Sequence, residues 1–350
     1  MNAFVDALLG WFDRAGRKHL PWQGRDPYRV WISEIMLQQT QVSTVIPYFE
    51  RFMQRFPDVN SLAAAPLDEV LHLWTGLGYY ARARNLHRAA KVLVEEYQGV
   101  MPTTLQQVQA LPGIGRSTAA AILAQAYELP HAILDGNVRR VLTRHFGIHG
   151  FPGEKKIEAL LWEAAEQHTP SVRVADYTQA IMDLGALVCT RIKPKCMECP
   201  LATSCAANAQ GLQSQLPTRR PKRVRPQRIA YVAVISDSSN AVLLQQRPAS
   251  GIWGGLWVCP QFDDQQSCES FVHARVENAS SLQKLPVIHH AFTHFDLQLH
   301  PCWVSHATPR GLVADEAQYC WYDPQRPARI GLAKPVLDIL KLLRMPASGN

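Results

Sequence analysis

Residues 111–124 read LPGIGRSTAAAILA, where a proline, Gly113 and Gly115 separate two segments with the apolar spacing of helices. Glycine lets the backbone approach a partner closely, and the N–H groups at the start of a helix attract an anion. Arg116 and Ser117 open the second helical segment. The pattern therefore predicts a helical hairpin suited to holding a phosphate, although a plain turn between helices would have the same sequence.

Helical periodicity continues on both sides of this hairpin, from the N-terminus to about residue 210. Apolar residues recur three and four positions apart, and short breaks with glycine or proline separate the segments. The helices predicted from this spacing cover residues 28–41, 66–75, 81–97, 104–110, 116–127, 136–146, 154–167 and 176–188. We therefore expect an all-α domain in this part of the chain.

The pattern changes after a basic stretch, PTRRPKRVRPQR at residues 217–228. This stretch holds six Arg or Lys and one larger apolar residue, Val224, so it cannot build a core. Strands are then expected at 229–236, 241–246 and within 286–304, and helices at about 264–277 and 333–344. The predicted fold is multi-domain, with an all-α domain over 1–210, a basic linker over 211–228 and a smaller α+β domain over 229–345.

Composition and charge narrow the class of protein. With 47% hydrophobic and 19% charged residues, the 350-residue chain is globular and long enough for about two domains. It has no run of roughly eighteen apolar residues, and Asp6 and Asp13 interrupt its first stretch, so we expect neither a membrane span nor a secretory signal. The formal charge of +7 favours a polyanionic partner.

Four of the eight cysteines lie within a short loop, spaced C-x6-C-x2-C-x5-C. They are Cys189, Cys196, Cys199 and Cys205, and the other four are scattered singly. Four thiolates so close in sequence fit a structural zinc or an iron–sulfur cluster, and the single CxxC pair favours the cluster. Free thiols in a chain of this length also indicate a reducing compartment.

The segment GLGYYARARNL at 76–86 interleaves two tyrosines, Tyr79 and Tyr80, with Arg82 and Arg84. Aromatic rings that stack on bases and arginines that contact phosphates are typical of nucleic-acid binding. Both tyrosines could equally be core residues.

Two carboxylates suit cleavage of a glycosidic bond, which needs an acid for the leaving group and an ionised carboxylate for the positive sugar ring. In PYRVWISEIMLQQTQ, Glu34 is expected to share a helix face with Leu37, Gln38 and Gln41, a partly apolar setting that would raise its pKa. In HAILDGNVRRVL, Asp135 stands at a predicted helix N-cap, which favours the ionised form. An ordinary surface glutamate and a purely structural cap are the alternatives.

Six motifs occur together in this chain, and in order they are LPW at 20–22, SEIMLQQTQV at 33–42, GLGYYARARNL, LPGIGRSTA, ILDGNVRRVL and the four-cysteine loop. Through nearly the whole helical half the chain resembles the MutY-type adenine DNA glycosylases of the helix-hairpin-helix superfamily. The resemblance implies two helical subdomains with a DNA-facing cleft, a [4Fe–4S] cluster on the four cysteines, and a C-terminal Nudix-like domain that recognises 8-oxoguanine.

The activity that this resemblance implies is hydrolysis of the N-glycosidic bond of adenine mispaired with 8-oxoguanine, or with guanine, in base excision repair. Its partner would be double-stranded DNA with such a mispair, bound by a monomer in the cytoplasm in association with the nucleoid. Such an enzyme must first extrude the base from the stack.

Site residues are carried over from the family position by position. Glu34 would protonate adenine at N7 and later activate water, and Asp135 would stabilise the oxocarbenium-like sugar or its transient covalent adduct. Asn137 would position groups nearby. The implied DNA and base contacts are Trp22, Gln38, Gln39, Tyr79, Gly113, Gly115, Ser117, Gln179, Phe292, Thr293 and His294.

Some of these positions have a more specific implied role. Gln39 and Tyr79 match positions that wedge into the duplex, and Trp22 and Gln179 match positions that line the adenine pocket. Sister enzymes of the endonuclease III type carry, at the position of Ser117, a lysine that attacks the sugar. Because serine lacks that amine, we expect a monofunctional hydrolase that leaves an abasic site.

In the C-terminal half the resemblance rests on VLLQQRPASGIWGGLWVCPQF at 242–262 and HHAFTHFDL at 289–297. Thr293 stands where serine is common in the family, and it keeps a hydroxyl able to bond 8-oxoguanine. Nudix hydrolases hold magnesium on a glutamate-rich helix, whereas the corresponding stretch here has only Glu269 and Glu277. Nucleotide hydrolysis is therefore not expected.

Three other functions stay open at this point. An endonuclease III-like bifunctional glycosylase and lyase for oxidised pyrimidines is disfavoured by Ser117 and by the extra C-terminal domain. A non-catalytic sensor of DNA damage is disfavoured by the presence of both carboxylates. A Nudix-type nucleotide hydrolase is disfavoured by the lack of a magnesium helix.

Overall fold

The computed structural model describes residues 2–220, 224–277, 279, 282–310 and 318–344. Parts of the predicted linker (221–223) and of the predicted C-terminal domain (278, 280–281, 311–317 and 345) lie outside the described residues. None of the helices within the described ranges is long and apolar enough to cross a membrane.

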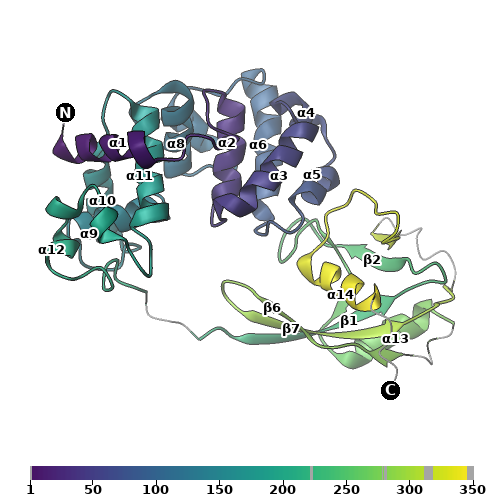
Figure 1. Ribbon diagram of the computed structural model, residues 1–350. Coiled ribbons are helices and arrows are strands. Elements are labelled where there is room, and N and C mark those ends of the chain that lie inside the picture. Colours follow the sequence, from purple (N-terminus) through teal and green to yellow (C-terminus); the bar gives the residue numbers. More distant parts are fainter. Residues whose placement is uncertain (1, 221–223, 278, 280–281, 311–317, 345–350) are drawn as a thin grey trace. The chain divides into compact units, whose positions relative to one another are not determined.

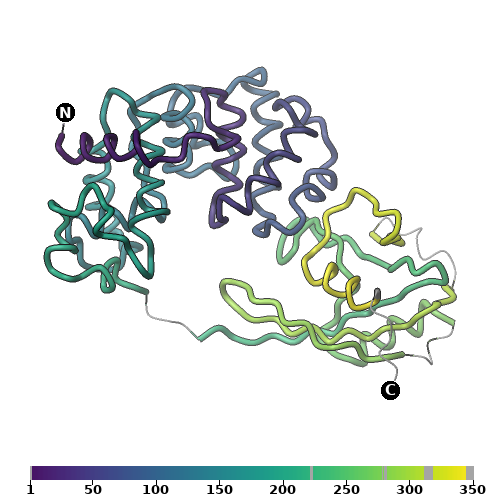
Figure 2. Tube along the Cα trace, viewed as in Figure 1, coloured from purple at the N-terminus to yellow at the C-terminus, as the bar shows by residue number. Residues whose placement is uncertain are grey.

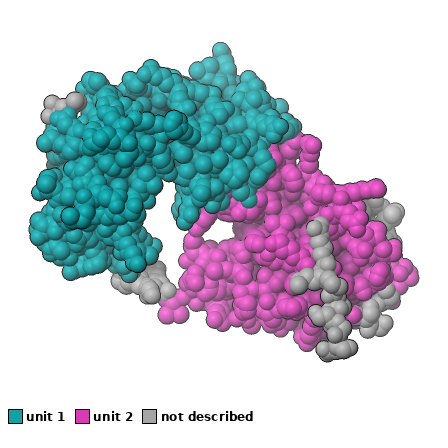
Figure 3. Space-filling model, viewed as in Figure 1, with its two compact units in different colours: residues 1–64, 85–222 teal, residues 65–84, 223–350 magenta. Residues whose placement is uncertain are grey.

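Two compact units make up the chain, coloured separately in Figure 3. Unit 1 comprises residues 1–64 and 85–222, and unit 2 comprises residues 65–84 and 223–350. The C-terminal unit thus includes a short segment of the helical half, which the sequence pattern does not indicate. The predicted boundaries at 210 and 229 stay a prediction.

Unit 1 is built of helices, which Figures 1 and 2 trace from purple to teal. Its α-helices are α1 (Ala3–Ala15), α2 (Pro27–Leu37), α3 (Val42–Arg55), α4 (Val59–Ala64), most of α6 (Ala81–Tyr97), α7 (Leu105–Ala110), α8 (Arg116–Tyr127), α9 (Gly136–His145), α10 (Lys155–His168), α11 (Val174–Asp183) and α12 (Ala206–Ala209). Shorter turns are the π-helical η1 (Leu184–Val188) and the 3-10 turns η2 (Cys196–Glu198) and η3 (Ala202–Ser204). The all-α prediction for this half is confirmed.

The alanine-rich helix α8 packs against α2, α7 and α11. Residues 119–124 of α8 are all buried, and four of these six are alanines, whose small side chains let the neighbouring helices come close. Leu8, Leu142 and Tyr177 from three other helices join the same core. This packing fixes the two helices that carry Glu34 and Ser117.

The predicted helix over 28–41 is wrong at its C-terminal end. α2 ends at Leu37, Gln38 has left the helical conformation, and Gln39 is left-handed with a φ of 57°. Such a backbone is costly for a residue other than glycine, so the surrounding structure must hold it. Gln38 and Gln39 therefore lie on a tight turn between α2 and α3, and not on the face of α2.

Unit 2 contains two sheets and three helices among its described residues. Its helices are α5 (Leu67–Trp74), α13 (Gln265–Arg275) and α14 (Lys334–Arg344), and its strands are β1 (Gln227–Ile235), β2 (Val242–Gln246), β3 (Trp257–Val258), β4 (Gln261–Phe262), β5 (Gln283–Lys284), β6 (Ile288–Ala291), β7 (Asp296–Val304) and β8 (Tyr319–Tyr322). One sheet has the order β4-β1-β7-β5 with β6 also on β7, and the other has the order β3-β2-β8.

The larger sheet is organised by a long parallel pair. β1 and β7 pair from Gln227 opposite Asp296 to Ile235 opposite Val304, while β6 pairs with β7 in antiparallel fashion. α13 packs against β1, and Cys268 of this helix is fully buried in the core beneath the sheet. The predicted strands, the two predicted helices and the α+β class are confirmed.

Candidate active site

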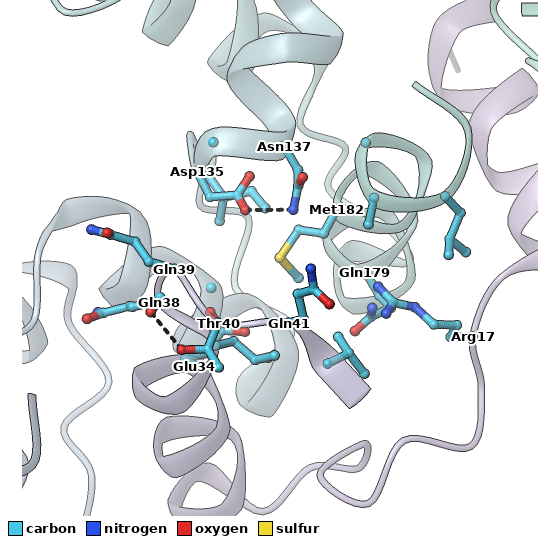
Figure 4. A pocket seen from close by; sticks show the side chains of 18 of the residues that line it. Arg17, Glu34, Gln38, Gln39, Thr40, Gln41, Asp135, Asn137, Gln179 and Met182 are labelled. Carbon is cyan, nitrogen blue, oxygen red and sulfur yellow. Dashed lines mark hydrogen bonds between the residues drawn. The ribbon is translucent and has the colours of Figure 1, made fainter. Parts of the chain in front are cut away.

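A cavity of about 870 Å³ opens among α2, the turn after it, α8, the start of α9 and α11, all in unit 1 (Figure 4). It brings together eight of the predicted site residues, namely Trp22, Glu34, Gln38, Gln39, Ser117, Asp135, Asn137 and Gln179. We call it the Glu34 cavity. Residues far apart in sequence therefore meet around a space large enough for a nucleobase.

Glu34 lies in the wall of this cavity, on α2, with its carboxylate partly shielded from solvent. Its Oε1 accepts a hydrogen bond of 2.8 Å from the side-chain amide of Gln125 on α8. Burial raises the pKa of Glu34 to about 7, the Gln125 hydrogen bond opposes this rise, and the negative charge of Asp135 adds to it. Glu34 is therefore a carboxyl group that holds a proton in a large fraction of molecules near neutral pH.

Asp135 faces the same cavity from the start of α9. It is the N-cap of this helix, and its Oδ1 accepts a 2.7 Å hydrogen bond from the backbone N–H of Val138. Asn137 donates to its other oxygen at 3.3 Å (Figure 4). The cap and the charge of Arg140 lower the pKa of Asp135, as the sequence suggested, but burial outweighs them and the net direction is upward.

Ser117 holds the backbone that leads into Asp135. Its Oγ accepts a 2.9 Å hydrogen bond from the N–H of Leu134. The residue therefore lies in the cavity wall without an amine, and its hydroxyl fixes the approach of the neighbouring carboxylate.

Three residues that the sequence did not single out hold the polar wall in place: Arg17, which lines the cavity, and Asp183 and Gln125, which bond to lining residues. The buried carboxylate of Asp183 accepts hydrogen bonds from the backbone N–H of Arg17 at 2.8 Å and from its Nε at 2.9 Å. Gln179 donates to the same carboxylate at 2.7 Å. The third is Gln125, the partner of Glu34. No local motif marks these pairs, because Arg17 and Asp183 are 166 residues apart.

Arg140 connects the Asp135 side of the cavity to the cysteine loop. Its guanidinium donates to the side-chain oxygen of Asn137 at 2.9 Å and to the backbone oxygen of Cys189 at 2.6 Å. Gly185 stands against Asn137, and a Cβ at this glycine would lie 2.6 Å from the Asn137 Cβ. The position of Asn137 is therefore set from both sides.

The four predicted ligands Cys189, Cys196, Cys199 and Cys205 line one shared cavity formed by η1, η2, η3 and α9. Arg144 donates to the sulfur of Cys189 at 3.3 Å and to the backbone oxygen of Thr190 at 2.7 Å. Within the described ranges, no group of three or more His, Cys, Asp or Glu side chains is arranged to hold a metal ion. The four thiols thus surround a common space.

The predicted hairpin around Gly113 is present between α7 and α8. Gly113 has a φ of 79°, and a Cβ there would lie 2.7 Å from the Cβ of Asn85. Gly115 caps α8 without a side-chain hydrogen bond. The turn therefore depends on the glycine at position 113 both for its backbone and for its packing.

The remaining predicted contacts lie in unit 2 and do not line the Glu34 cavity. Tyr79 has a left-handed backbone with a φ of 49° and a half-exposed side chain. Phe292, Thr293 and His294 form the turn between β6 and β7, closed by a 2.9 Å hydrogen bond from the N–H of Phe292 to the oxygen of Phe295.

The expected phosphate contacts of Arg82 and Arg84 are not what these side chains make. Arg82 is buried, stacks on the rings of Trp74 and Tyr79, and donates to the oxygen of Gly78 at 3.2 Å. Arg84 donates to the oxygen of Gly254 at 2.8 Å. Both guanidinium groups therefore serve the packing of unit 2.

Comparison with protein families defines the class. Residues 32–167, which carry both carboxylates and Ser117, match the HhH-GPD superfamily of base excision DNA repair proteins. Residues 231–342 match the NUDIX domain. The helical fold and the cavity with two carboxylates are thus those of a base excision DNA repair protein.

Individual relatives define the family within this class. A protein of Buchnera aphidicola subsp. Acyrthosiphon pisum named adenine DNA glycosylase is 38% identical over 339 residues, which is 97% of each chain. The adenine DNA glycosylase of Rattus norvegicus is 34% identical over 396 residues, covering 95% of this chain and 77% of the rat protein. The chain belongs to the adenine DNA glycosylase family, and it is a DNA glycosylase.

A solved structure agrees with this assignment for the helical half. The structure of a thermostable thymine-DNA glycosylase has 30% sequence identity and a TM-score of 0.54, and the match covers 59% of this chain and 95% of that protein. The shared part corresponds in size to the helical unit, and the MutY-type resemblance noted in the sequence is confirmed.

Proposed function

We propose that this chain is a monofunctional adenine DNA glycosylase that removes adenine mispaired with 8-oxoguanine, or with guanine, from double-stranded DNA. The observation that carries the proposal is the pair of carboxylates in one cavity with different surroundings. Burial raises the pKa of both carboxyl groups, to about 7 for Glu34, but at Asp135 two N–H donors and the charge of Arg140 oppose the rise and favour the ionised form. One acid and one carboxylate are what glycosidic cleavage requires.

In the proposed reaction, the protonated Glu34 donates its proton to N7 of the extruded adenine while the bond to the sugar breaks. The carboxylate of Asp135 stabilises the positive charge that develops on the sugar ring, or forms a transient adduct with it. Glu34 is then ionised, and it can accept a proton from the water that attacks the sugar. The products are free adenine and an abasic site.

Recognition of adenine would come from the opposite wall of the cavity. The amide nitrogen of Gln179 is bonded to Asp183, and this orients its carbonyl oxygen as an acceptor for an amino group. Adenine presents such a group at N6, and the buried Trp22 supplies an apolar surface nearby. These two residues support adenine as the excised base.

The position of Ser117 supports hydrolysis without strand cleavage. A Schiff base to the sugar needs an amine, and Ser117 offers a hydroxyl that already accepts the N–H of Leu134. The endonuclease III-like alternative would therefore lack its nucleophile at this position.

We further propose that Cys189, Cys196, Cys199 and Cys205 hold a [4Fe–4S] cluster. A single zinc ion would draw four sulfurs to within about 3.8 Å of one another, given Zn–S bonds of about 2.3 Å. A cluster spreads its four thiolates over four irons. Four thiols that line one cavity support a shared metal centre, and the single CxxC pair among them favours the cluster. About four irons per chain in the purified protein are expected, and one zinc in their place would refute the proposal.

Location and partners follow from the same activity. We propose that the protein acts as a monomer on DNA in the cytoplasm, in association with the nucleoid. The net charge of +7 supports a polyanionic partner. Light scattering of the free protein and of its complex with a short duplex would give one protein per duplex, and a dimer in both would contradict the monomer.

The deciding experiment uses a duplex with one adenine opposite 8-oxoguanine, incubated with the protein and analysed with and without alkali. We expect strand breaks only after alkali. Breaks without alkali, together with a borohydride-trapped complex, would indicate a lyase. No excision of adenine, with cleavage at an oxidised pyrimidine, would move the function to the endonuclease III type.

A further inference from the structure

The segment of the helical half that belongs to unit 2 makes several specific contacts there. Arg84 donates from Nη1 to the backbone oxygen of Gly254 at 2.8 Å. The hydroxyl of Tyr80 donates to the oxygen of Leu332 at 3.1 Å and accepts the N–H of Gly76 at the same distance. The turn of residues 76–80, which we call the Tyr79 turn, is therefore bonded directly to the C-terminal part of the chain.

Helix α5, which precedes the Tyr79 turn, is also bonded to the C-terminal part of unit 2. Asp68 accepts hydrogen bonds from Nε1 of Trp257 and Nε2 of Gln246, both at 3.4 Å. A Cβ on Gly331 would lie 2.5 Å from the Cβ of Leu71, so the two backbones approach as closely as a glycine allows. This packing leaves little freedom between α5 and the C-terminal part of unit 2.

Residues 247–256, which we call the Trp253 loop, contact a second turn as well. The ring of Trp253 lies 5.4 Å from the rings of both His290 and Phe292. Phe292 in turn stacks on Phe295 at 4.6 Å. The turn of residues 292–294, which we call the Thr293 turn, is therefore supported by the loop that also accepts the hydrogen bond from Arg84.

The Trp253 loop is itself a rigid support. The N–H of Gly255 donates to the oxygens of Arg247 and Pro248, at 3.2 and 3.0 Å. A Cβ on Gly254 would lie only 2.4 Å from the oxygen of Ala249. A loop closed in this way can transmit a displacement from one contact to the other, because it has little room to deform.

We propose that the Trp253 loop joins the Tyr79 turn and the Thr293 turn into one recognition element for the base opposite the adenine, with Arg84 and Trp253 as positioning residues. The inference rests on the proposed function and adds to it two residues that need not touch DNA. Tyr79 needs such support, because its left-handed backbone is strained and its side chain is half exposed. The bond from Arg84 to Gly254 connects the helix that follows the Tyr79 turn directly to the loop that supports the Thr293 turn.

The test compares Arg84→Met with Arg88→Met, a matched loss of one charge at an exposed position on the same helix, α6. Single-turnover excision is measured with adenine opposite 8-oxoguanine and with adenine opposite guanine, and the ratio of the two rates is the readout. We expect Arg84→Met to lower this ratio about five- to tenfold, and Arg84→Lys, which can still donate to Gly254, to restore most of it. Arg88→Met should leave the ratio unchanged.

Double variants separate positioning from a general loss of structure. If Arg84 acts through the Tyr79 turn, then its loss should matter little once Tyr79 is gone. The double variant Arg84→Met/Tyr79→Leu should have a ratio of excision rates within about twofold of that of Tyr79→Leu alone. Trp253→Leu should lower the ratio as Arg84→Met does, and Trp253→Phe should lower it less. These last two variants keep the inference testable if Arg84→Met proves unstable in a thermal melt.

The outcomes distinguish the inference from the proposed function. A wild-type protein that excises adenine from neither duplex would overturn the proposed function, whereas one that excises it from both without a preference for 8-oxoguanine would overturn the inference. A wild-type preference that survives both Arg84→Met and Trp253→Leu would overturn the inference alone. Equal loss on both substrates, or full additivity with Tyr79→Leu, would also overturn it.

Discussion

The Glu34 cavity of unit 1 and the two turns of unit 2 that we propose for recognition of the opposite base hold their side chains in opposite environments. In the cavity, Trp22 and Gln179 are buried, and Glu34 is desolvated enough to shift its pKa to about 7. In the turns, Tyr79 and Thr293 are exposed, while the residues behind them are buried or bonded. Proton transfer needs shielding from water, whereas reading a base in a duplex needs exposed groups on a firm support.

The largest expected effect on the excision rate comes from removing the acid from the cavity, and this variant tests the comparison most severely. Glu34→Gln keeps the size and one hydrogen-bonding oxygen but cannot donate the proton, so single-turnover excision should fall about a thousandfold. Asp135→Asn should cause a loss of similar size, because the sugar cation loses its counter-charge. DNA affinity, measured by fluorescence anisotropy, should change little in either variant.

A rate within tenfold of wild type for either variant would show that the carboxylate is not part of the chemistry. A parallel loss of DNA affinity would assign it to binding instead.

The pH dependence sharpens the comparison, because the acid in the cavity should titrate near neutrality. The acid form of Glu34 disappears as the pH rises through its pKa of about 7, so excision should decline above this pH. The Gln125 hydrogen bond lowers that pKa, and Gln125→Leu should move the decline to higher pH. At pH 8.5 the variant could then retain several times more of its maximal rate than wild type, on the order of tenfold for a shift of one unit.

The matched control is Gln167→Leu on α10, where the amide bonds only to Glu163 in the described structure. Its pH profile should coincide with wild type. A shift of the Gln125→Leu profile to lower pH would contradict the assignment of Glu34 as the acid.

Changing a turn in unit 2 should have a smaller and more selective effect. Thr293→Ala removes one hydroxyl, and the loss of a single hydrogen bond of about 1 kcal/mol should lower excision opposite 8-oxoguanine about fivefold. Excision opposite guanine should stay the same. Equal loss on both substrates in a side-by-side assay would place Thr293 outside lesion recognition.

The smallest expected effect concerns stability. Glu34 has its ordinary pKa of 4.5 in the unfolded chain and about 7 in the fold, so its ionisation disfavours the fold as pH rises through this range. Glu34→Gln removes this penalty. Its Tm should exceed that of wild type by a few degrees at pH 8, with little difference at pH 4, and a lower Tm at pH 8 would contradict the desolvation of Glu34.

How far the sequence predicts this molecule depends on how local the interactions are. Helices follow from apolar spacing, and Glu34 and Asp135 follow from residue type within recognisable motifs. The break after Leu37 does not follow, because residues 38–41 contain no glycine or proline that would end a helix, and it is the tertiary structure that holds Gln39 left-handed.

The missed residues have partners that are distant in the chain. Arg17 meets Asp183 across 166 residues, and Arg84 meets Gly254 across 170. An arginine beside two tyrosines therefore suggests phosphate binding, although Arg84 is in fact bonded to a backbone oxygen that no local pattern could indicate.

Unit 2 is built from two segments that lie far apart in the chain, residues 65–84 and 223–350. The first segment must therefore wait for the second during synthesis. Residues 65–84 leave the ribosome early, but Trp257, Gly331 and Leu332, which they contact, are synthesised much later. At about 5–20 residues per second the wait is on the order of ten seconds or more. During this time the face of α5 around Leu71 lacks its covering partner, so an apolar surface stays open on the nascent chain until residues 331 and 332 have been made.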